Sequence, residues 1–382
     1  MNNSEILEII SGGENSAVEF KEADLKAENL SNEITALANT YGGLIFIGVN
    51  DSGETTGLNP NFNYEEWSMN IARNNIVPSA NINYEEYILE EKKIAIINVA
   101  KGKDRPYQTN KGKYLVRIGS TNRQATQNEL MRLFQQAGLF HYDLTAVDRT
   151  SLKDVNLTIA DNYFNRYDID FVNEDQKERI KLLQNTDILT ADNKLTVAGL
   201  LIFGINPQRY LYNASVSFVH FAGNEISDKL IDKQVVDGVL PNQIDRTVSL
   251  IKNNIQKKSV IEHTKRKNIG FIYNDFVFKE LITNACVHRN YSISGSSIRV
   301  FMFDNRIEFI SPGRLPNTVT IEKLKAGVSF SINHVIVKFL ENMRYIDKIG
   351  RGLPMVYNQA VNNNKDIQFK ELGEEFKVVL EL

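Results

Sequence analysis

Along the first third of the chain, the spacing of apolar residues predicts a mixture of helices and short strands. Between residues 30 and 41 apolar side chains recur at helical spacing, and the pair Gly42-Gly43 is expected to end that helix. The apolar run at residues 44–49 predicts a buried strand, and the polar residues 50–53 predict the turn that leaves it. Further elements are expected as a hairpin at 87–90 and 93–99, a strand at 114–118 and an amphipathic helix at 126–137.

The pattern changes in the rest of the chain. Residues 139–242 hold polar helical stretches and two apolar runs but no motif that suggests chemistry, so we interpret them as a connecting domain. From residue 243 onward helices come first, and a strand pair that turns at Asp304-Asn305 follows. The expected elements are helices at 158–167, 173–183, 243–255, 274–287 and 353–360, apolar runs at 196–204 and 214–222, and strands at 297–303, 306–310 and 376–380. The mixture predicts an α+β protein with three domains, at 1–138, 139–242 and 243–382.

Composition is typical of a folded chain with a substantial core. The chain has 382 residues, of which 42% are apolar and 24% are charged. Its single cysteine, Cys286, excludes an intramolecular disulfide and a multi-cysteine zinc module. No apolar run approaches the length of a membrane span, and the polar amino terminus lacks the features of a signal peptide. We therefore expect a soluble, cytoplasmic protein without a membrane partner.

Three acidic residues near the amino terminus form a first candidate site. Glu14 and Glu19 lie in one short segment, Lys21 follows on the Glu19 side of a predicted strand, and Asp51 lies in the turn after residues 44–49. Carboxylates of this kind can hold a divalent ion that activates water and neutralises charge during phosphodiester cleavage. Glutamate and aspartate are nevertheless common surface residues, and their spacing here, taken alone, favours ordinary solvated side chains.

Four separated motifs change this balance, because together they resemble the Schlafen, or AlbA-like, domain. They lie at residues 13–22 (GENSAVEFKE), 34–43 (ITALANTYGG), 47–51 (IGVND) and 114–120 (YLVRIGS), and the resemblance spans about residues 8–138. It implies that Glu14, Glu19 and Asp51 correspond to the carboxylates of RNA-cleaving members, with Lys21 beside them and Mg²⁺ or Mn²⁺ as the metal. Many bacterial relatives are instead described as DNA-binding regulators, so the three carboxylates permit cleavage without establishing it.

Basic residues gather between positions 92 and 123, where nine of them accompany a single acidic residue and give a local net charge of +8. The whole chain carries a net charge of only −3. Such residues attract phosphates, and Tyr107 and Tyr114 could stack on exposed bases. The alternative is a solvated hairpin whose lysines protect an edge strand. We name the nine residues the basic belt: Lys92, Lys93, Lys101, Lys103, Arg105, Lys111, Lys113, Arg117 and Arg123.

A second candidate site lies in the last third of the chain. Glu280 and Asn284 share one face of a predicted helix, where the glutamate could activate water and the asparagine could ligate Mg²⁺. Two glycine-containing turns follow, and the second opens a predicted helix whose amides could face phosphate groups. The candidate nucleotide-binding residues are Glu280, Asn284, His288, Arg289, Ser311, Gly313, Gly350, Arg351 and Gly352.

In their order these segments resemble the GHKL-type ATP-binding fold, an α/β sandwich, in the divergent subgroup found behind Schlafen-like domains. The resemblance rests on residues 280–285 (ELITNA), 288–291 (HRNY), 307–313 (IEFISPG) and 349–352 (IGRG), and it implies that ATP or ADP binds. The fold normally reads adenine with an aspartate where this chain has Ser311, whose hydroxyl is a weaker partner. Relatives are often labelled RecG-like, but no Walker A string occurs here, so we expect no helicase motor.

Together these observations suggest a nucleotide-regulated protein that binds structured RNA or DNA through the basic belt. It would recognise backbone and shape, because the sequence contains no zinc finger, RRM signature or obvious helix-turn-helix. It could also cleave its partner with Glu14, Glu19 and Asp51 around a metal ion. Two alternatives stay open: a DNA-binding transcriptional regulator with structural carboxylates, and an ATPase whose first domain docks partners. A homodimer is expected from family analogy alone.

Overall fold

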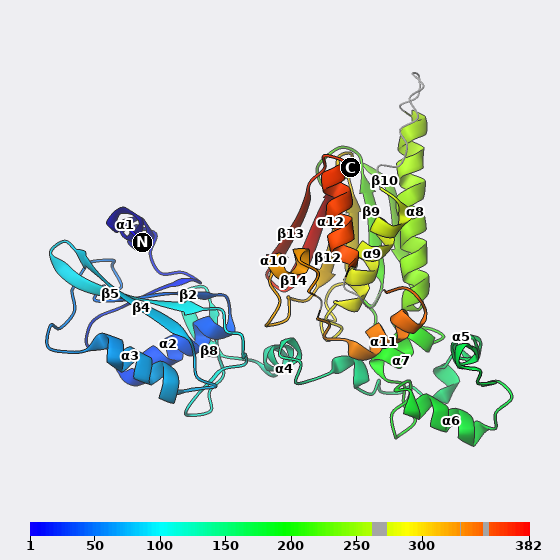
Figure 1. Ribbon diagram of the computed structural model, residues 1–382, viewed down its shortest axis with the longest axis horizontal. Coiled ribbons are helices and arrows are strands. Elements are labelled where there is room, and N and C mark those ends of the chain that lie inside the picture. Colours follow the sequence, from blue (N-terminus) through cyan, green and yellow to red (C-terminus); the bar gives the residue numbers. More distant parts are fainter. Residues whose placement is uncertain (262–272, 329, 347–350) are drawn as a thin grey trace. The chain divides into compact units, whose positions relative to one another are not determined.

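The computed structural model describes residues 1–261, 273–328, 330–346 and 351–382. The chain divides into two compact units, Met1–Phe140 and His141–Leu382, which are described separately below (Figure 1). Both units combine helices with sheets, so the predicted α+β class is confirmed. Of the two domain boundaries expected from the sequence, the one after residue 138 lies close to this division, and the one after residue 242 lies inside the second unit.

A four-stranded sheet forms the centre of the first unit. Successive side chains of one of its central strands point to opposite faces, so Ile45 and Ile47 contact one hydrophobic core and Phe46 contacts another. The first strand pairs with its neighbour in parallel, and the other neighbours are antiparallel. In spatial order the strands are β1 (Val18–Lys21), β2 (Gly42–Ile47), β5 (Lys92–Ala100) and β4 (Ile82–Leu89).

Helices pack on both faces of this sheet. The helices α2 (Ala27–Asn39) and α3 (Tyr64–Asn74) contribute to the core that contains Ile45, whereas α1 (Asn3–Ser11) contributes to the core that contains Phe46. The pair Gly42-Gly43, expected to end the preceding helix, instead begins β2. The reason is close chain packing, because a Cβ atom on Gly43 would lie 2.5 Å from the carbonyl oxygen of Ala17.

The first unit also contains a hairpin that packs on the surface of α2. The amide of Asn39, at the end of α2, donates hydrogen bonds to the carbonyl oxygens of Tyr107 (2.8 Å) and Leu115 (2.9 Å) and so fixes the hairpin against the helix. The remaining elements are β3 (Ile76–Val77) paired with β6 (Gln108–Thr109), the hairpin β7 (Leu115–Ile118) with β8 (Thr121–Gln124), and α4 (Gln127–Gln136).

A six-stranded sheet forms the centre of the second unit. In spatial order its strands are β10 (Leu230–Val236), β9 (Val216–Phe221), β11 (Ile298–Met302), β12 (Arg306–Pro312), β14 (Glu375–Glu381) and β13 (Ile367–Leu372). Only β9 and β11 pair in parallel among these neighbours. Because β9 and β10 come from the stretch expected to be a connecting domain, that stretch and the last third of the chain share one sheet and one hydrophobic core.

Helices cover this sheet and extend beyond it. The helices α8 (Leu240–Ile261) and α9 (Asp275–Val287) contact its strands, and α12 (Gly352–Asn362) packs on α9 (Figure 1). Cys286 of α9 is fully buried, and this burial raises the pKa of its thiol to about 12. The other helices are α5 (Leu157–Phe164), α6 (Gln176–Asn185), α7 (Val197–Phe203), α10 (Ile321–Lys325) and α11 (His334–Asn342). Within the described ranges, none has the length and hydrophobicity that crossing a bilayer requires.

Candidate functional site

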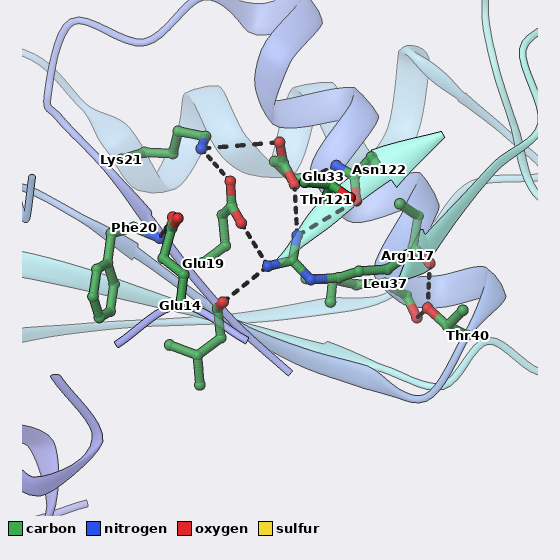
Figure 2. Close-up of polar contacts among 12 residues, drawn as sticks. Glu14, Glu19, Phe20, Lys21, Glu33, Leu37, Thr40, Arg117, Thr121 and Asn122 are labelled. Carbon is green, nitrogen blue, oxygen red and sulfur yellow. Dashed lines mark hydrogen bonds and ion pairs between the residues drawn. The ribbon is translucent and has the colours of Figure 1, made fainter. Parts of the chain in front are cut away.

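In the first unit, the predicted carboxylate Glu19 lies in a buried cluster of charges around Arg117 (Figure 2). The guanidinium of Arg117 on β7 pairs with Glu19 on β1 at 2.6 Å and with Glu33 on α2 at 3.3 Å. The amide of Asn122 on β8 donates to Glu33 at 2.5 Å, and the ammonium of Lys21 pairs with Glu19 and lies 3.9 Å from Glu33. We name these five residues the Arg117 cluster. Sequence reasoning missed Glu33, which directly precedes the motif at 34–43, and Asn122, which follows the motif at 114–120.

Backbone contacts hold Arg117 as firmly as its ion pairs do. Its guanidinium donates to the carbonyl oxygen of Asn15 from two nitrogens, at 2.8 Å and 3.0 Å, and to that of Val18 at 2.9 Å. The side chain is only 1% exposed. A guanidinium has five N–H groups, so this one residue joins the turn before β1, β1 itself, α2 and the β7–β8 hairpin.

The cluster contains two carboxylates and two cations, and burial shifts the protonation of its members. Burial raises the pKa of Glu33, and the charge of Glu19 raises it further, against the opposing effects of Asn122, Lys21 and Arg117. For Lys21, burial lowers the pKa, but the hydrogen bond and charge of Glu19 and the charge of Glu33 together hold it above its ordinary value. The arrangement therefore favours the charged form of Lys21, whereas the raised pKa of Glu33 favours the protonated form of that carboxyl.

The structure does not bring the three predicted metal ligands together. Glu14 accepts a hydrogen bond from the backbone amide of Phe20 at 2.9 Å, and Asp51 lies exposed in the turn after β2. Both carboxylate oxygens of Glu19 already face a cation, Lys21 on one side and Arg117 on the other. In the part of the chain that the structure describes, no three His, Cys, Asp or Glu side chains are grouped so that they could hold a metal ion. As arranged, the expected ligands do not fit a shared divalent ion, because an internal arginine and lysine already neutralise Glu19.

The basic belt is divided by burial. Arg105 and Arg117 are buried, since only 1% of Arg105 and 5% of Arg117, counted over the whole residue, is exposed to solvent. Neither residue can therefore contact a nucleic acid on the surface of this structure. Tyr107 is also buried, at 2%, and Tyr114 is half-buried with its ring 6.3 Å from that of Phe134. These residues are part of the packing of the first unit, which corrects the sequence-based assignment of the two arginines as nucleic-acid contacts.

Five members of the belt have partners that lie outside it in the sequence. Surface ion pairs of this kind contribute little to stability, so the lysines can exchange a carboxylate for a phosphate at little cost. Arg123 is held more firmly, because its hydrogen bonds to Glu129 keep the pKa of that carboxyl at about 2. The pairs are Lys93 with Glu86 (2.8 Å), Lys111 with Glu28 (2.7 Å), Lys113 with Glu28 (3.9 Å), Arg123 with Glu129 (2.7 Å), and Lys92 with the carbonyl oxygen of Thr55 (2.7 Å).

In the second unit, most of the predicted nucleotide-binding residues line one cavity of about 500 Å³. Apolar side chains such as Phe276, Phe309 and Val378 form much of its lining, and polar and charged side chains form the rest. Gly350 lies outside the described residues. The predicted residues that line the cavity are Glu280, Asn284, His288, Ser311, Gly313, Arg351 and Gly352.

Two neighbouring segments explain the polar part of this cavity. Glu280 and Asn284 lie one turn apart on α9, and the amide of Asn284 donates to a carboxylate oxygen of Glu280 at 2.7 Å. Gly352, the first residue of α12, lies against the same carboxylate, since a Cβ atom there would be 1.8 Å from it. A side chain at this position would displace the Glu280 carboxylate, so glycine lets the start of α12 lie directly against it.

Ser311 and Arg289 have structural partners of their own. The hydroxyl of Ser311 donates to the carbonyl oxygen of Ala285 at 2.7 Å, so its oxygen faces a ligand only as an acceptor. Arg289 does not line the cavity. It is 2% exposed and donates to the carbonyl oxygens of Asn213 (2.7 Å) and Ser296 (2.9 Å), which corrects the sequence-based assignment of this residue to the nucleotide.

Several cavity residues were not found by sequence reasoning. Lys279 directly precedes Glu280 on α9, and its ammonium lies 4.3 Å from the centroid of the Tyr345 ring. Arg314 pairs with Glu374 at 2.8 Å. Arg344 lies just beyond α11, where no sequence motif marks it. With Arg351 these residues add four cationic side chains to a lining that also contains the carboxylates of Glu280 and Glu341.

Residues 14–126 match the family model described as "Schlafen, AlbA_2", and residues 295–380 match the model described as "Putative ATP-dependent DNA helicase recG C-terminal". The chain carries a Schlafen AlbA_2 domain and an ATPase-like domain. The Schlafen domain contains the Arg117 cluster and the basic belt, and the ATPase-like domain contributes the strands and helix beside the cavity. This order of domains is the one that the sequence motifs predicted, and it suggests a nucleic-acid-binding, ATP-related protein.

Comparison with solved structures finds a similar chain in a crystal structure of the DIP2311 protein from Corynebacterium diphtheriae. The two are 18% identical with a TM-score of 0.47, and the match covers 96% of this chain. This chain spans 64% of the length of that one. No curated protein matches the chain.

Replacing the central arginine of the Schlafen domain tests whether it is structural. Arg117→Met removes the cation and leaves Glu19 and Glu33 buried with Lys21 alone, so we expect a loss of about 3–5 kcal/mol in the free energy of unfolding. Trp67, the only tryptophan of the chain, lies in this domain and reports its urea unfolding by fluorescence. Lys103→Met, at an exposed position of the same belt, is the control and should change the midpoint little. Equal midpoints for the two variants would contradict the structural role.

His288 predicts how the stability of the ATPase-like domain depends on pH. Burial lowers the pKa of His288 to about 4, so the folded imidazole stays neutral while the unfolded one gains a proton below about 6.5. Stability of this domain should therefore fall as the pH drops from about 6.5 to about 4. The His288→Gln variant should lose part of this decrease in stability at low pH. Relative to the wild type, the substitution should therefore be less destabilising at pH 5 than at pH 7. An NMR titration that gave the imidazole an ordinary midpoint would overturn the assignment.

Proposed function

We propose that this protein binds nucleic acid through its Schlafen domain and that a nucleotide in the cavity of its ATPase-like domain controls that binding. The observation that carries the proposal is the convergence of Glu280, Asn284 and Gly352 on a cavity of about 500 Å³. A cavity of this size is in the range that holds a nucleotide-sized ligand. Its apolar wall suits a base, and the cationic side chains in its lining suit phosphate groups.

The residues around the cavity fit an ATP or ADP molecule with its Mg²⁺. Asn284 would meet the metal ion through its side-chain carbonyl, because its amide nitrogen already bonds to Glu280. A bound Mg²⁺ would supply neutralisation of the phosphate charge. The amides at the start of α12, beside Gly352, favour an anion, and Ser311 could accept one hydrogen bond from a base amino group.

The exposed lysines of the belt support binding to a nucleic-acid backbone. Lysines in weak surface pairs, such as Lys111 and Lys113 with Glu28, can be transferred to phosphates with release of counterions. Binding is favoured over cleavage because Glu19 is already neutralised by Arg117 and Lys21. The choice between RNA and DNA, a homodimer and a cytoplasmic location stay expectations from the sequence.

Calorimetry with ATP and ADP tests the nucleotide site. Asn284→Ala removes the group expected to meet the metal ion, so we expect affinity for Mg²⁺-ATP to fall at least about tenfold, or about 1.4 kcal/mol. Asn173→Ala, at an exposed position outside the cavity, is the matched control and should bind as the wild type does. Absence of binding at millimolar nucleotide would reduce the ATPase-like domain to a scaffold.

Fluorescence anisotropy with labelled tRNA and duplex DNA tests the surface. The double variant Lys111→Gln, Lys113→Gln should lower the slope of log affinity against log salt by about 2, because two phosphate contacts are lost. Lys177→Gln with Lys181→Gln, exposed on the second unit, is the control. Saturating ATP should change the affinity of the wild-type protein for the labelled nucleic acid. An unchanged slope would mean that the nucleic acid contacts another surface. A nucleic-acid affinity that does not change with ATP would contradict nucleotide control.

A further inference from the structure

The second unit contains one helix, α11, that begins beside the chain junction and ends at the nucleotide cavity. Its first turn is held by Asp143, whose carboxylate accepts hydrogen bonds from the backbone amides of Val335 (2.8 Å) and Ile336 (3.4 Å). Asp143 is fully buried and belongs to the short 3-10 helix Tyr142–Leu144, which starts two residues after the first unit ends. The residues that lead out of the Schlafen domain are thus bonded directly to the start of α11.

The opposite end of α11 lies in the cavity. Glu341, Arg344 and Tyr345 all line it. Arg344 has a positive φ of 64°, which is uncommon for a residue other than glycine, and its amide bonds to the carbonyl oxygen of Glu341 at 2.8 Å. Among the residues that the structure describes, its guanidinium has no hydrogen-bond or ion-pair partner. An unpaired arginine in a strained backbone position at a cavity is a group that an anion would engage.

The body of α11 packs into the hydrophobic core of the second unit. Phe339 lies in the hydrophobic core with its ring centroid 5.0 Å from that of Phe203 and 5.5 Å from that of Tyr163. Just before the helix, Asn333 donates to the carbonyl oxygens of Val287 and Arg289, both at 2.8 Å. These last two contacts tie the start of α11 to the end of α9, which carries Glu280 and Asn284.

The joint at Asp143 depends on charge as well as shape. Burial holds the pKa of this carboxyl above its ordinary value, against the opposing effects of the two amides of α11 and of His141 and His334. A carboxylate at the start of a helix also interacts favourably with the helix dipole. Hydrogen bonds in which the acceptor is ionised are stronger than those between neutral groups.

We propose that nucleotide binding in the cavity displaces α11 and that α11 transmits this change to the junction between the two units. The phosphate groups of the nucleotide engage Arg344 at one end of the helix, and Asp143 passes the resulting displacement to the residues that lead into the Schlafen domain. This regulation rests on the proposed function, since it assumes that the cavity binds a nucleotide. Asp143 acts as a positioning residue, and Arg344 acts as a binding residue.

Two variants of the full chain separate these roles. Asp143→Asn keeps the size of the side chain but removes its charge, so ATP affinity measured by calorimetry should stay within about twofold of the wild type. The change in nucleic-acid affinity that ATP causes should shrink to less than about twofold. Asp148→Asn, whose side chain is exposed and pairs with Lys194, is the matched control and should keep the full change. Arg344→Gln should instead weaken ATP binding about tenfold.

Hydrogen exchange on the wild-type chain provides a second measurement that needs neither a variant nor a nucleic acid. Mg²⁺-ADP and Mg²⁺-ATP should alter amide protection both in α11 and in residues 142–147. Binding that leaves residues 142–147 unchanged would overturn the inference, as would an Asp143→Asn variant that keeps the full ATP effect. Absence of nucleotide binding would defeat the proposed function, and the inference with it. Altered exchange without any change in nucleic-acid affinity would support the coupling and defeat only the proposed control of nucleic acid.

Discussion

The Schlafen domain depends on the need to neutralise charges that its fold has buried. Removing one partner of a buried ion pair costs several kcal/mol, and without Arg117 only Lys21 and Asn122 would remain beside Glu19 and Glu33. One guanidinium meets this need while also binding the carbonyl oxygens of Asn15 and Val18. The positions of β1, α2 and the β7–β8 hairpin are therefore set together, and the acidic residues that suggest metal chemistry are held by an arginine instead.

Local patterns predicted the parts of the structure that local spacing controls. The helix expected at 274–287 corresponds to α9 (Asp275–Val287), and the strand expected at 306–310 lies within β12 (Arg306–Pro312). Glu280 and Asn284 were placed on one helix face by their separation of four residues, and both line the same cavity. The order of motifs was also sufficient to predict both domain families.

Contacts between distant parts of the chain could not be predicted in this way. The charge of the basic belt was counted along the sequence, but its partners Glu28 and Glu86 come from other elements, so the local sum says little about the surface potential. The pairing of β9 with β11 joins strands about 80 residues apart and unites two stretches that look separate in the sequence. Arg344 takes its position from the way in which α11 ends, for which no residue pattern is a signal.

The burial of Cys286 has a practical consequence. A thiolate, not a thiol, attacks alkylating reagents, and a thiol with a pKa of about 12 in a closed core is nearly inert at neutral pH. Since it is the only cysteine of the chain, any modification of the native protein must follow an opening of the second unit. The rate of thiol labelling therefore measures that opening. In the same sample, the fluorescence of Trp67 reports the unfolding of the first unit. The unmodified chain thus contains a separate reporter for the motions of each unit.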